Sequence, residues 1–217
     1  MKAPRKAPGR PSGRPLSFDR DQALRQAMLV FWRYGYEAAS IAGLTAAMGI
    51  TPPSLYTAFG DKKRLFLEAV GLYMSGPMMS EGIFRGAPTA REAVRELLHA
   101  AAVGSTQGGE VPPGCMLVSS ATNCSPDAAD VQSAVADIRR RIEATLAAKI
   151  QADMDAGLLP ADTSASALAS LFMAVTQGMS TQARDGATTA KLLAMAEAAM
   201  RAWPGSSARR TRSPATS

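Results

Sequence analysis

The feature that most constrains the fold is the stretch from Ser40 to Lys63, SIAGLTAAMGITPPSLYTAFGDKK. Ser40 is a favourable N-cap, and apolar side chains follow it at about i, i+3 and i+7, which predicts one face of a helix. Gly49 stands where a left-handed residue would end that helix, and Thr51 followed by Pro52 is typical of a second helix start. Two short helices joined by a turn of about three residues predict a DNA-binding helix-turn-helix.

The net charge of +6 is concentrated at the two ends of the chain. Residues 1–20 have a net charge of +5 and residues 204–217 a net charge of +3, which leaves −2 for the rest. Residues 1–17 and 204–217 lack apolar periodicity, so we expect a disordered basic arm and a disordered basic tail. An arm with Arg10 and Arg14 in repeated Gly-Arg-Pro units is attracted to phosphates and can lie in a minor groove. The alternative is that the basic arm only increases the solubility of the protein.

The composition, 47% hydrophobic and 19% charged, is typical of a globular protein. The sequence contains no run of about 18 apolar residues, so it predicts no membrane span. No apolar segment follows the basic start, whereas one would follow it in a secretory signal. Two cysteines, Cys115 and Cys124, are too few for a disulfide framework and are typical of a reducing compartment. These features predict a cytoplasmic protein without a membrane partner.

Helix caps and apolar spacing predict about nine helices and no strand, which is an all-α class. The first helix is expected to begin after Asp19 and to end at Gly35. Farther along, the stretch 78–88 is expected to be a loop. Ser125 followed by proline is expected to open a long helix, and Asp162 to cap the next one.

The last two helices, within residues 162–203, are expected to form an antiparallel hairpin. Small residues along them would let helix backbones approach closely; these are Ala167, Ala174, Gly178, Ala194 and Ala198. Two such hairpins from two subunits can build a four-helix bundle, which predicts a homodimer. Packing of the hairpin against the chain's own body is the alternative.

Residues 18–75 resemble the TetR/AcrR family of one-component transcriptional regulators. The resemblance rests on Phe31, Gly35-Tyr36, Ser40-Ile41, Leu44, Met48-Gly49-Ile50, Ser54-Leu55-Tyr56, Phe59, Lys62 and Leu65-Phe66. It implies an all-α homodimer with a three-helix DNA-binding domain, here residues 18–63, and a ligand-binding and dimerisation domain, here residues 64–203. A double-stranded DNA operator and a small-molecule effector are the implied partners, and release of a repressor by its ligand is the implied mechanism.

The resemblance also implies which residues meet DNA. The segment facing the major groove would be Thr51, Pro52, Pro53, Ser54 and Tyr56, and the phosphates would be held by Ser40, Tyr56 and Lys62. This segment contains no Arg, Asn or Gln for bidentate base contacts. We therefore expect thymine methyl groups against Pro52 or Pro53, hydroxyl contacts and DNA shape to provide the discrimination.

An effector pocket is expected between the middle helices, because adaptable methionine side chains suit varied apolar ligands. Its predicted lining is Met74, Met78, Met79, Phe84, Leu98, Met116, Thr122 and Asn123. Ordinary core packing is the alternative for each of these residues.

No catalytic motif is apparent, so the sequence predicts no catalytic residue, no metal and no cofactor. His99 is the only histidine, and with two cysteines a closed zinc site would need carboxylates from elsewhere. No glycine-rich phosphate loop or dinucleotide fingerprint occurs. Two functions compete with the ligand-released regulator. One is a nonspecific basic nucleic-acid binder; the other is a thiol-based redox sensor that uses Cys115 and Cys124.

Overall fold

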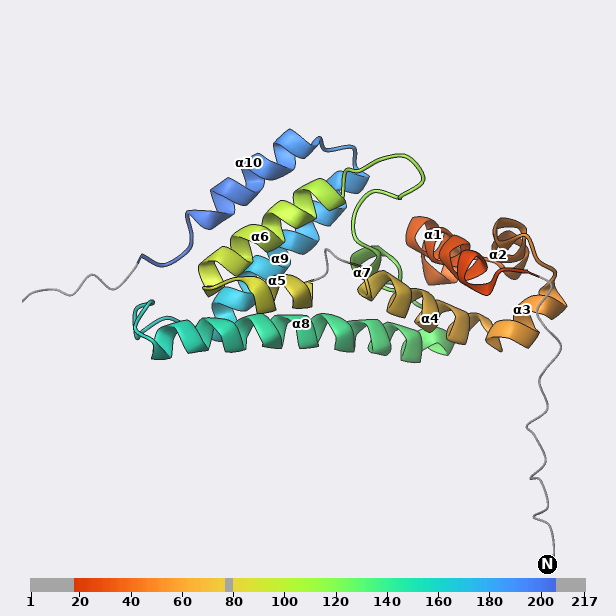
Figure 1. Ribbon diagram of the computed structural model, residues 1–217, viewed down its shortest axis with the longest axis horizontal. Coiled ribbons are helices and arrows are strands. Elements are labelled where there is room, and N and C mark those ends of the chain that lie inside the picture. Colours follow the sequence, from red (N-terminus) through yellow and green to blue (C-terminus); the bar gives the residue numbers. More distant parts are fainter. Residues whose placement is uncertain (1–17, 77–79, 206–217) are drawn as a thin grey trace, which may run out of the picture.

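The computed structural model describes residues 18–76 and 80–205. Within these residues the chain forms ten α-helices and one 3-10 helix, and no strand (Figure 1). The helices are α1 (Arg20–Ala38), α2 (Ile41–Met48), α3 (Pro52–Phe59), α4 (Lys62–Met74), α5 (Ser80–Gly86), α6 (Ala90–Gly104), α7 (Met116–Ser119), η1 (Pro126–Ala128), α8 (Ala129–Asp155), α9 (Ala165–Arg184) and α10 (Thr189–Met200). The predicted all-α class is confirmed. The expected disorder of residues 1–17 falls outside the described residues, as does that of the tail beyond residue 205.

Local side-chain caps start the short N-terminal helices. The hydroxyl of Ser40 accepts a hydrogen bond from the Gly43 amide at 3.0 Å and begins α2. Gly49 ends α2 in the left-handed conformation with φ 66°, which glycine adopts without steric cost. The carboxylate of Asp61 accepts from the Arg64 amide at 2.8 Å and begins α4. These caps explain why the starts of α2 and α4 could be located from sequence.

Three aromatic rings join α1 to α4 and form the core of the N-terminal domain. Phe31 meets Phe66 edge-on with ring centroids 5.1 Å apart, and Tyr36 meets Phe66 in a similar way at 5.2 Å. Phe31 and Phe66 are fully buried, and edge-to-face contact between such rings is favourable beyond the area they bury. The cluster fixes α1 against α4 and leaves α2 and α3 on the outer side.

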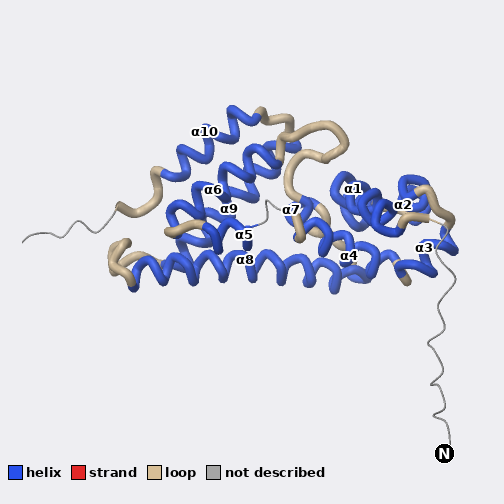
Figure 2. Tube along the Cα trace, in the orientation of Figure 1, coloured by secondary structure: helices blue, strands red, loops and turns tan. Residues whose placement is uncertain are grey.

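The body of the molecule is built along α8, a 27-residue helix that runs beneath α4, α5 and α9 (Figure 2). Helices α6, α9 and α10 lie at the end opposite the N-terminal domain (Figure 1). The buried carboxylate of Asp153, near the end of α8, accepts from the Ala90 amide at 2.7 Å and so caps α6. Thr89 caps the same helix by accepting from the Glu92 amide at 3.2 Å. Two helices far apart in sequence are thereby joined at one end.

Three local expectations were wrong. The stretch 78–88 contains the helix α5, whose Phe84 is buried in the core, although a loop was expected there. Ser125 makes no side-chain cap, and the proline after it opens the 3-10 helix η1, so that α8 begins only at Ala129. Ser164 caps α9 by accepting from the Ala167 amide, whereas Asp162 was expected to do so. Each difference lies where tertiary contacts or the neighbouring turn decide the helix start.

α1 is kinked at Gly35, which has φ 81° and ψ 173°. This region of backbone conformation is essentially restricted to glycine. A Cβ at this position would also stand 3.4 Å from the carbonyl oxygen of Ser120. The kink is therefore tied to glycine by its backbone conformation, since a contact at 3.4 Å is ordinary van der Waals packing.

Gly35→Ala is expected to lower the free energy of unfolding by about 1–3 kcal/mol, because alanine is strained at this φ and ψ. Gly71→Ala is the matched control, since Gly71 lies inside α4 with open space around its missing Cβ. That variant is expected to gain about 0.5–1 kcal/mol. Urea unfolding at one protein concentration measures both changes. Equal effects of the two substitutions would contradict a special conformational demand at Gly35.

Candidate nucleic-acid interface

Helix α3 exposes a short, uncharged surface. Thr51, Pro52 and Pro53 are exposed, and Ser54 is half-buried, whereas Leu55 is fully buried beneath them. The hydroxyls of Thr51 and Ser54 lie 3.0 Å apart and share a hydrogen bond. Thr51 also accepts from the Ser54 amide at 3.4 Å as the cap of α3. This surface therefore presents two proline rings beside a pair of linked hydroxyls.

Two further predicted contact residues are exposed around α3. Tyr56 is 49% exposed on α3. Ser40 is exposed at the start of α2, where amide groups of the first helical turn favour an anion. The predicted arm residues Arg10 and Arg14 lie outside the described residues. The placement of Tyr56 and Ser40 leaves both available to a ligand that covers α2 and α3.

Lys62 is held by neighbouring groups at the start of α4. Its Nζ lies 4.5 Å from the centre of the Tyr36 ring and donates to the Glu37 carbonyl oxygen at 3.3 Å. Burial lowers the pKa of Lys62, while the negative charge of Glu37 opposes this shift. The adjacent Lys63 pairs with Asp130 of α8. The two lysines thus differ: Lys63 joins α4 to the body, and Lys62 keeps its ammonium near the surface of the N-terminal domain.

The end of α1 is hydrogen-bonded to the body at several points. The Tyr36 amide donates to the Ser120 carbonyl oxygen at 2.7 Å. The Glu37 carboxylate accepts from the amide and the hydroxyl of Ser125, both at 2.7 Å. Arg184, at the end of α9, donates to the carbonyl oxygen of Trp32 and to the Ser119 hydroxyl. The placement of α2 and α3 therefore depends on α7, α9 and the segment between α7 and η1.

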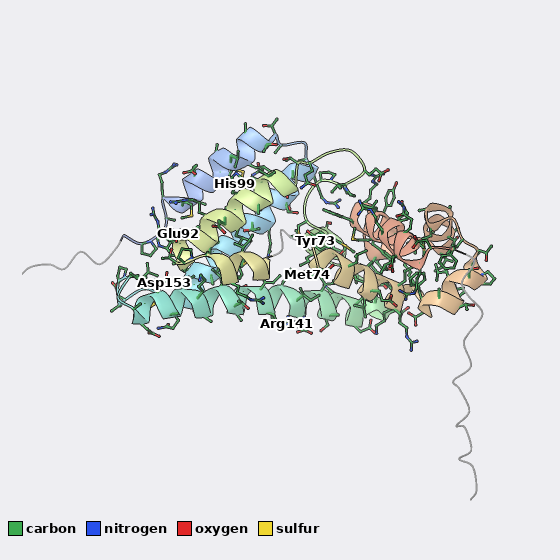
Figure 3. All side chains as sticks on the ribbon, viewed as in Figure 1. Tyr73, Met74, Glu92, His99, Arg141 and Asp153 are labelled. Carbon is green, nitrogen blue, oxygen red and sulfur yellow. The ribbon has the colours of Figure 1, made fainter. Side chains whose placement is uncertain are left out.

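A cavity of about 760 Å³ lies at this junction. Its lining is mainly apolar and comes from both parts of the molecule; it includes Met28 of α1, Tyr73 of α4, Ala101 of α6, Leu117 of α7, Ile142 of α8 and Met173 of α9. Figure 3 shows Tyr73 where α4 passes close to α7. Pockets of this size and character are typical of small-molecule sites.

This cavity is not the pocket predicted from sequence. Phe84, Leu98 and Met116 are buried in the core, and Met74 is partly buried against it. Thr122 and Asn123 are exposed in the segment that follows the single-turn helix α7. None of these six residues lines the cavity, and Met78 and Met79 lie outside the described residues. The helix periodicity identified apolar faces but not which face borders empty space.

The two cysteines have different surroundings and are not joined by a disulfide. Cys115 lines the cavity, and its Sγ accepts from the Tyr73 hydroxyl at 3.2 Å. Burial and the negative charge of Glu37 raise the pKa of Cys124, which disfavours the reactive thiolate. The environment of Cys124 thus lacks the usual signature of a redox-active thiol.

Other sites considered from sequence have little support within the described residues. His99 is exposed on α6, on the side that faces α10 (Figure 3). No group of three or more His, Cys, Asp and Glu side chains in these ranges is arranged to hold a metal ion. Among the described helices, none has the length and apolar character needed to cross a bilayer.

Comparison with protein families gives two matches that together cover most of the folded chain. Residues 23–69 match the bacterial regulatory proteins of the tetR family, and residues 90–203 match a tetracyclin repressor-like C-terminal domain. The chain belongs to the TetR family of transcriptional regulators. The helix-turn-helix α2–α3 is the DNA-binding element of this TetR protein, and the body from α6 onward is its C-terminal domain.

Named TetR relatives are similar along most of the chain. The HTH-type transcriptional repressor ComR of Escherichia coli is 32% identical over 194 residues, 88% of this chain and 92% of that protein. The repressor BdcR of the same organism is 35% identical, over 58% of this chain and 64% of its own length. The TetR family regulator CifR, solved as a cysteine mutant with a 26-bp operator DNA, matches with a TM-score of 0.81 and 42% identity, covering 88% of this chain and all of that one.

Glu37 provides a pH test of the junction. The amide and hydroxyl of Ser125 hold the pKa of Glu37 below its ordinary value of 4.5. A carboxylate with a lowered pKa stabilises the fold above its unfolded-state pKa, and this contribution is lost as the pH falls through the folded-state value. Glu37→Gln should therefore lower the urea midpoint at about pH 7, and its difference from wild type should shrink by about pH 3. Glu96→Gln, at an exposed carboxylate of α6, is the control; a pH-independent deficit for Glu37→Gln would contradict the assignment.

Proposed function

We propose that this protein is a ligand-released repressor that binds a palindromic operator as a homodimer. The observation that carries the proposal is the exposed helix α3 on a TetR helix-turn-helix whose placement depends on a cavity-bearing body. A relative is named a transcriptional repressor, and a structural relative was solved with operator DNA. Double-stranded DNA and a small-molecule effector are the proposed partners.

The proposed division of labour on DNA follows from the chemistry of the two surfaces. Ser40, Tyr56 and Lys62 hold phosphates, and the arm residues Arg10 and Arg14 add sequence-independent attraction. The bases are read by the exposed part of α3, which offers two proline rings and two hydroxyls but no bidentate donor. Thymine methyl groups and DNA shape therefore carry much of the discrimination.

The proposed dimer forms through α9 and α10. Ala167, Leu171, Ala174 and Gly178 are all exposed on α9 at helical spacing, which creates a strip of small and apolar groups. Leu171, which is 45% exposed, adds a large apolar side chain to this strip of small residues. Small residues allow close helix approach, so this strip suits a second copy of the same hairpin.

The effector in this proposal occupies the cavity between α1 and the body. Met28, Leu29 and Trp32 of α1 line one side of it. A ligand that fits better when α1 is displaced would shift the dimer away from the spacing needed for two half-sites. The thiol-based alternative is less well supported, because the pKa of Cys124 is raised and Cys115 is hydrogen-bonded to Tyr73.

Operator selection followed by footprinting tests which bases the protein recognises. We expect a palindromic motif with thymine at contacted positions, and Pro52→Ala or Pro53→Ala should weaken its binding about fivefold. Replacing the contacted thymine with uracil removes the methyl group, so it should weaken DNA binding by the wild-type protein to a similar extent. The same replacement should cause little further loss of binding by the proline variant.

Two outcomes would count against this reading. One is a G-rich motif that is lost on Thr51→Ala and insensitive to both prolines. The other is a failure of the chain without residues 1–14 to keep its preferred palindrome. Loss of nearly all affinity in that shortened chain would instead favour a nonspecific basic nucleic-acid binder.

The dimer surface is tested by Ala174→Glu, which places a charge in the proposed interface. We expect this variant to sediment as a monomer at concentrations where wild type is a dimer, because an unpaired charge in a closely packed interface is costly. Ala148→Glu, on the exposed face of α8, is the matched control and should leave the mass unchanged. A dimer for both variants would place the interface elsewhere.

A further inference from the structure

Two cations line the cavity, Arg25 on the exposed start of α1 and Arg139 on the body. Arg139 belongs to α8 and is only partly exposed. Its guanidinium donates to the Leu117 carbonyl oxygen at 2.6 Å, and no ion pair to a carboxylate is found for it among the described residues. Burial lowers the pKa of Arg139, and its charged neighbour Arg140 adds to this effect. A guanidinium has several N–H donors, so one neutral protein acceptor leaves most of them for solvent or a ligand.

Other cationic and donor groups lie close to the same wall. Cys115, which lines the cavity at the start of α7, acts electrostatically on both Arg139 and Arg184 and opposes the lowering of their pKa by burial. Arg184 differs from Arg139 because its guanidinium bonds the carbonyl oxygens of Trp32 and Arg33 and the Ser119 hydroxyl. The guanidinium donors of Arg184 are thus used in hydrogen bonds within the protein, whereas those of Arg139 are available to a ligand.

The carboxylates that line the cavity lie at the start of α1 and not on α8, which carries Arg139. Asp19 and Asp21 belong to the exposed start of α1, where Asp19 caps the helix by accepting from the Asp21 and Gln22 amides. The wall formed by α7 and α8 contributes Arg139 together with apolar side chains such as Leu117, Val118 and Ile142. The cavity is therefore apolar with a positively charged wall.

We infer that the cavity binds an organic anion, with its apolar body against the α1, α6 and α9 side chains and its acidic group on Arg139. This inference rests on the proposed function, since it names the chemical class of the effector. A carboxylate or sulfonate can take two parallel hydrogen bonds from a guanidinium, and such charge-assisted bonds are strong where water is largely excluded. The pairing would also compensate the desolvation of Arg139.

Two fluorescent dyes with the same apolar body provide the test on the free protein. 8-Anilinonaphthalene-1-sulfonate carries an anionic group, and N-phenyl-1-naphthylamine is its neutral counterpart. Arg139→Met is expected to weaken binding of the sulfonate dye about tenfold or more, and binding of the neutral dye less than about twofold. Arg139→Lys keeps the charge and should retain a preference for the sulfonate dye. Thermal unfolding of each variant verifies that it is folded.

Two further variants control for position. Arg141→Met removes the same charge from the exposed side of α8, away from the other helices, and should change neither affinity (Figure 3). Ala101→Phe fills the cavity from α6 and should abolish binding of both dyes. Equal loss of both dyes in Arg139→Met, no loss of either, or sulfonate binding that survives Ala101→Phe would overturn the inference.

Operator binding, measured separately, distinguishes this inference from the proposed function. If neither dye releases the operator while Arg139→Met still discriminates between the dyes, release by ligand fails and the anion site stands. If the neutral dye releases the operator and the sulfonate dye does not bind in the cavity, release stands and the anion site falls.

Discussion

The break in α1 at Gly35 leaves backbone groups that must find partners elsewhere. In an unbroken helix the Tyr36 amide would donate to the Trp32 carbonyl oxygen; here it donates to Ser120. The carbonyl oxygen of Trp32 accepts instead from Arg184 at the end of α9. Because unpaired backbone groups are costly when buried, these bonds favour one placement of the DNA-binding helices against the body.

The cavity lies beside this junction, and that position links the proposed ligand to the proposed DNA contacts. Its walls include Trp32, which precedes the kink by one turn, and Arg139, which belongs to the body. A bound molecule would touch both sides of the junction, so its binding energy could differ between two placements of α1. Such differential affinity is what a ligand needs in order to shift a conformational equilibrium.

The candidate DNA surface could be predicted from sequence, whereas the cavity could not. Thr51 caps α3, and Pro52 and Ser54 lie in its first turn; the exposure of Thr51 and Pro52 follows from the burial of Leu55 beside them. The cavity lining combines α1, α4, α6, α7, α8 and α9, and periodicity shows only which face of each helix is apolar. An unpaired arginine such as Arg139 also has no distinct sequence signal, because its neighbours on α8 are arginines with different surroundings.

The sequence by itself determined the all-helical class and the position of the helix-turn-helix, because caps such as Ser40 and Asp61 act within three residues of the helix start. Tertiary structure decided the features that depend on distant partners. α5 exists because Phe84 is buried against the body, and α6 is capped in part by Asp153 from α8. The attachment of α1 to α9 through Arg184 is of the same kind, since its hydrogen bonds join residues more than 150 positions apart.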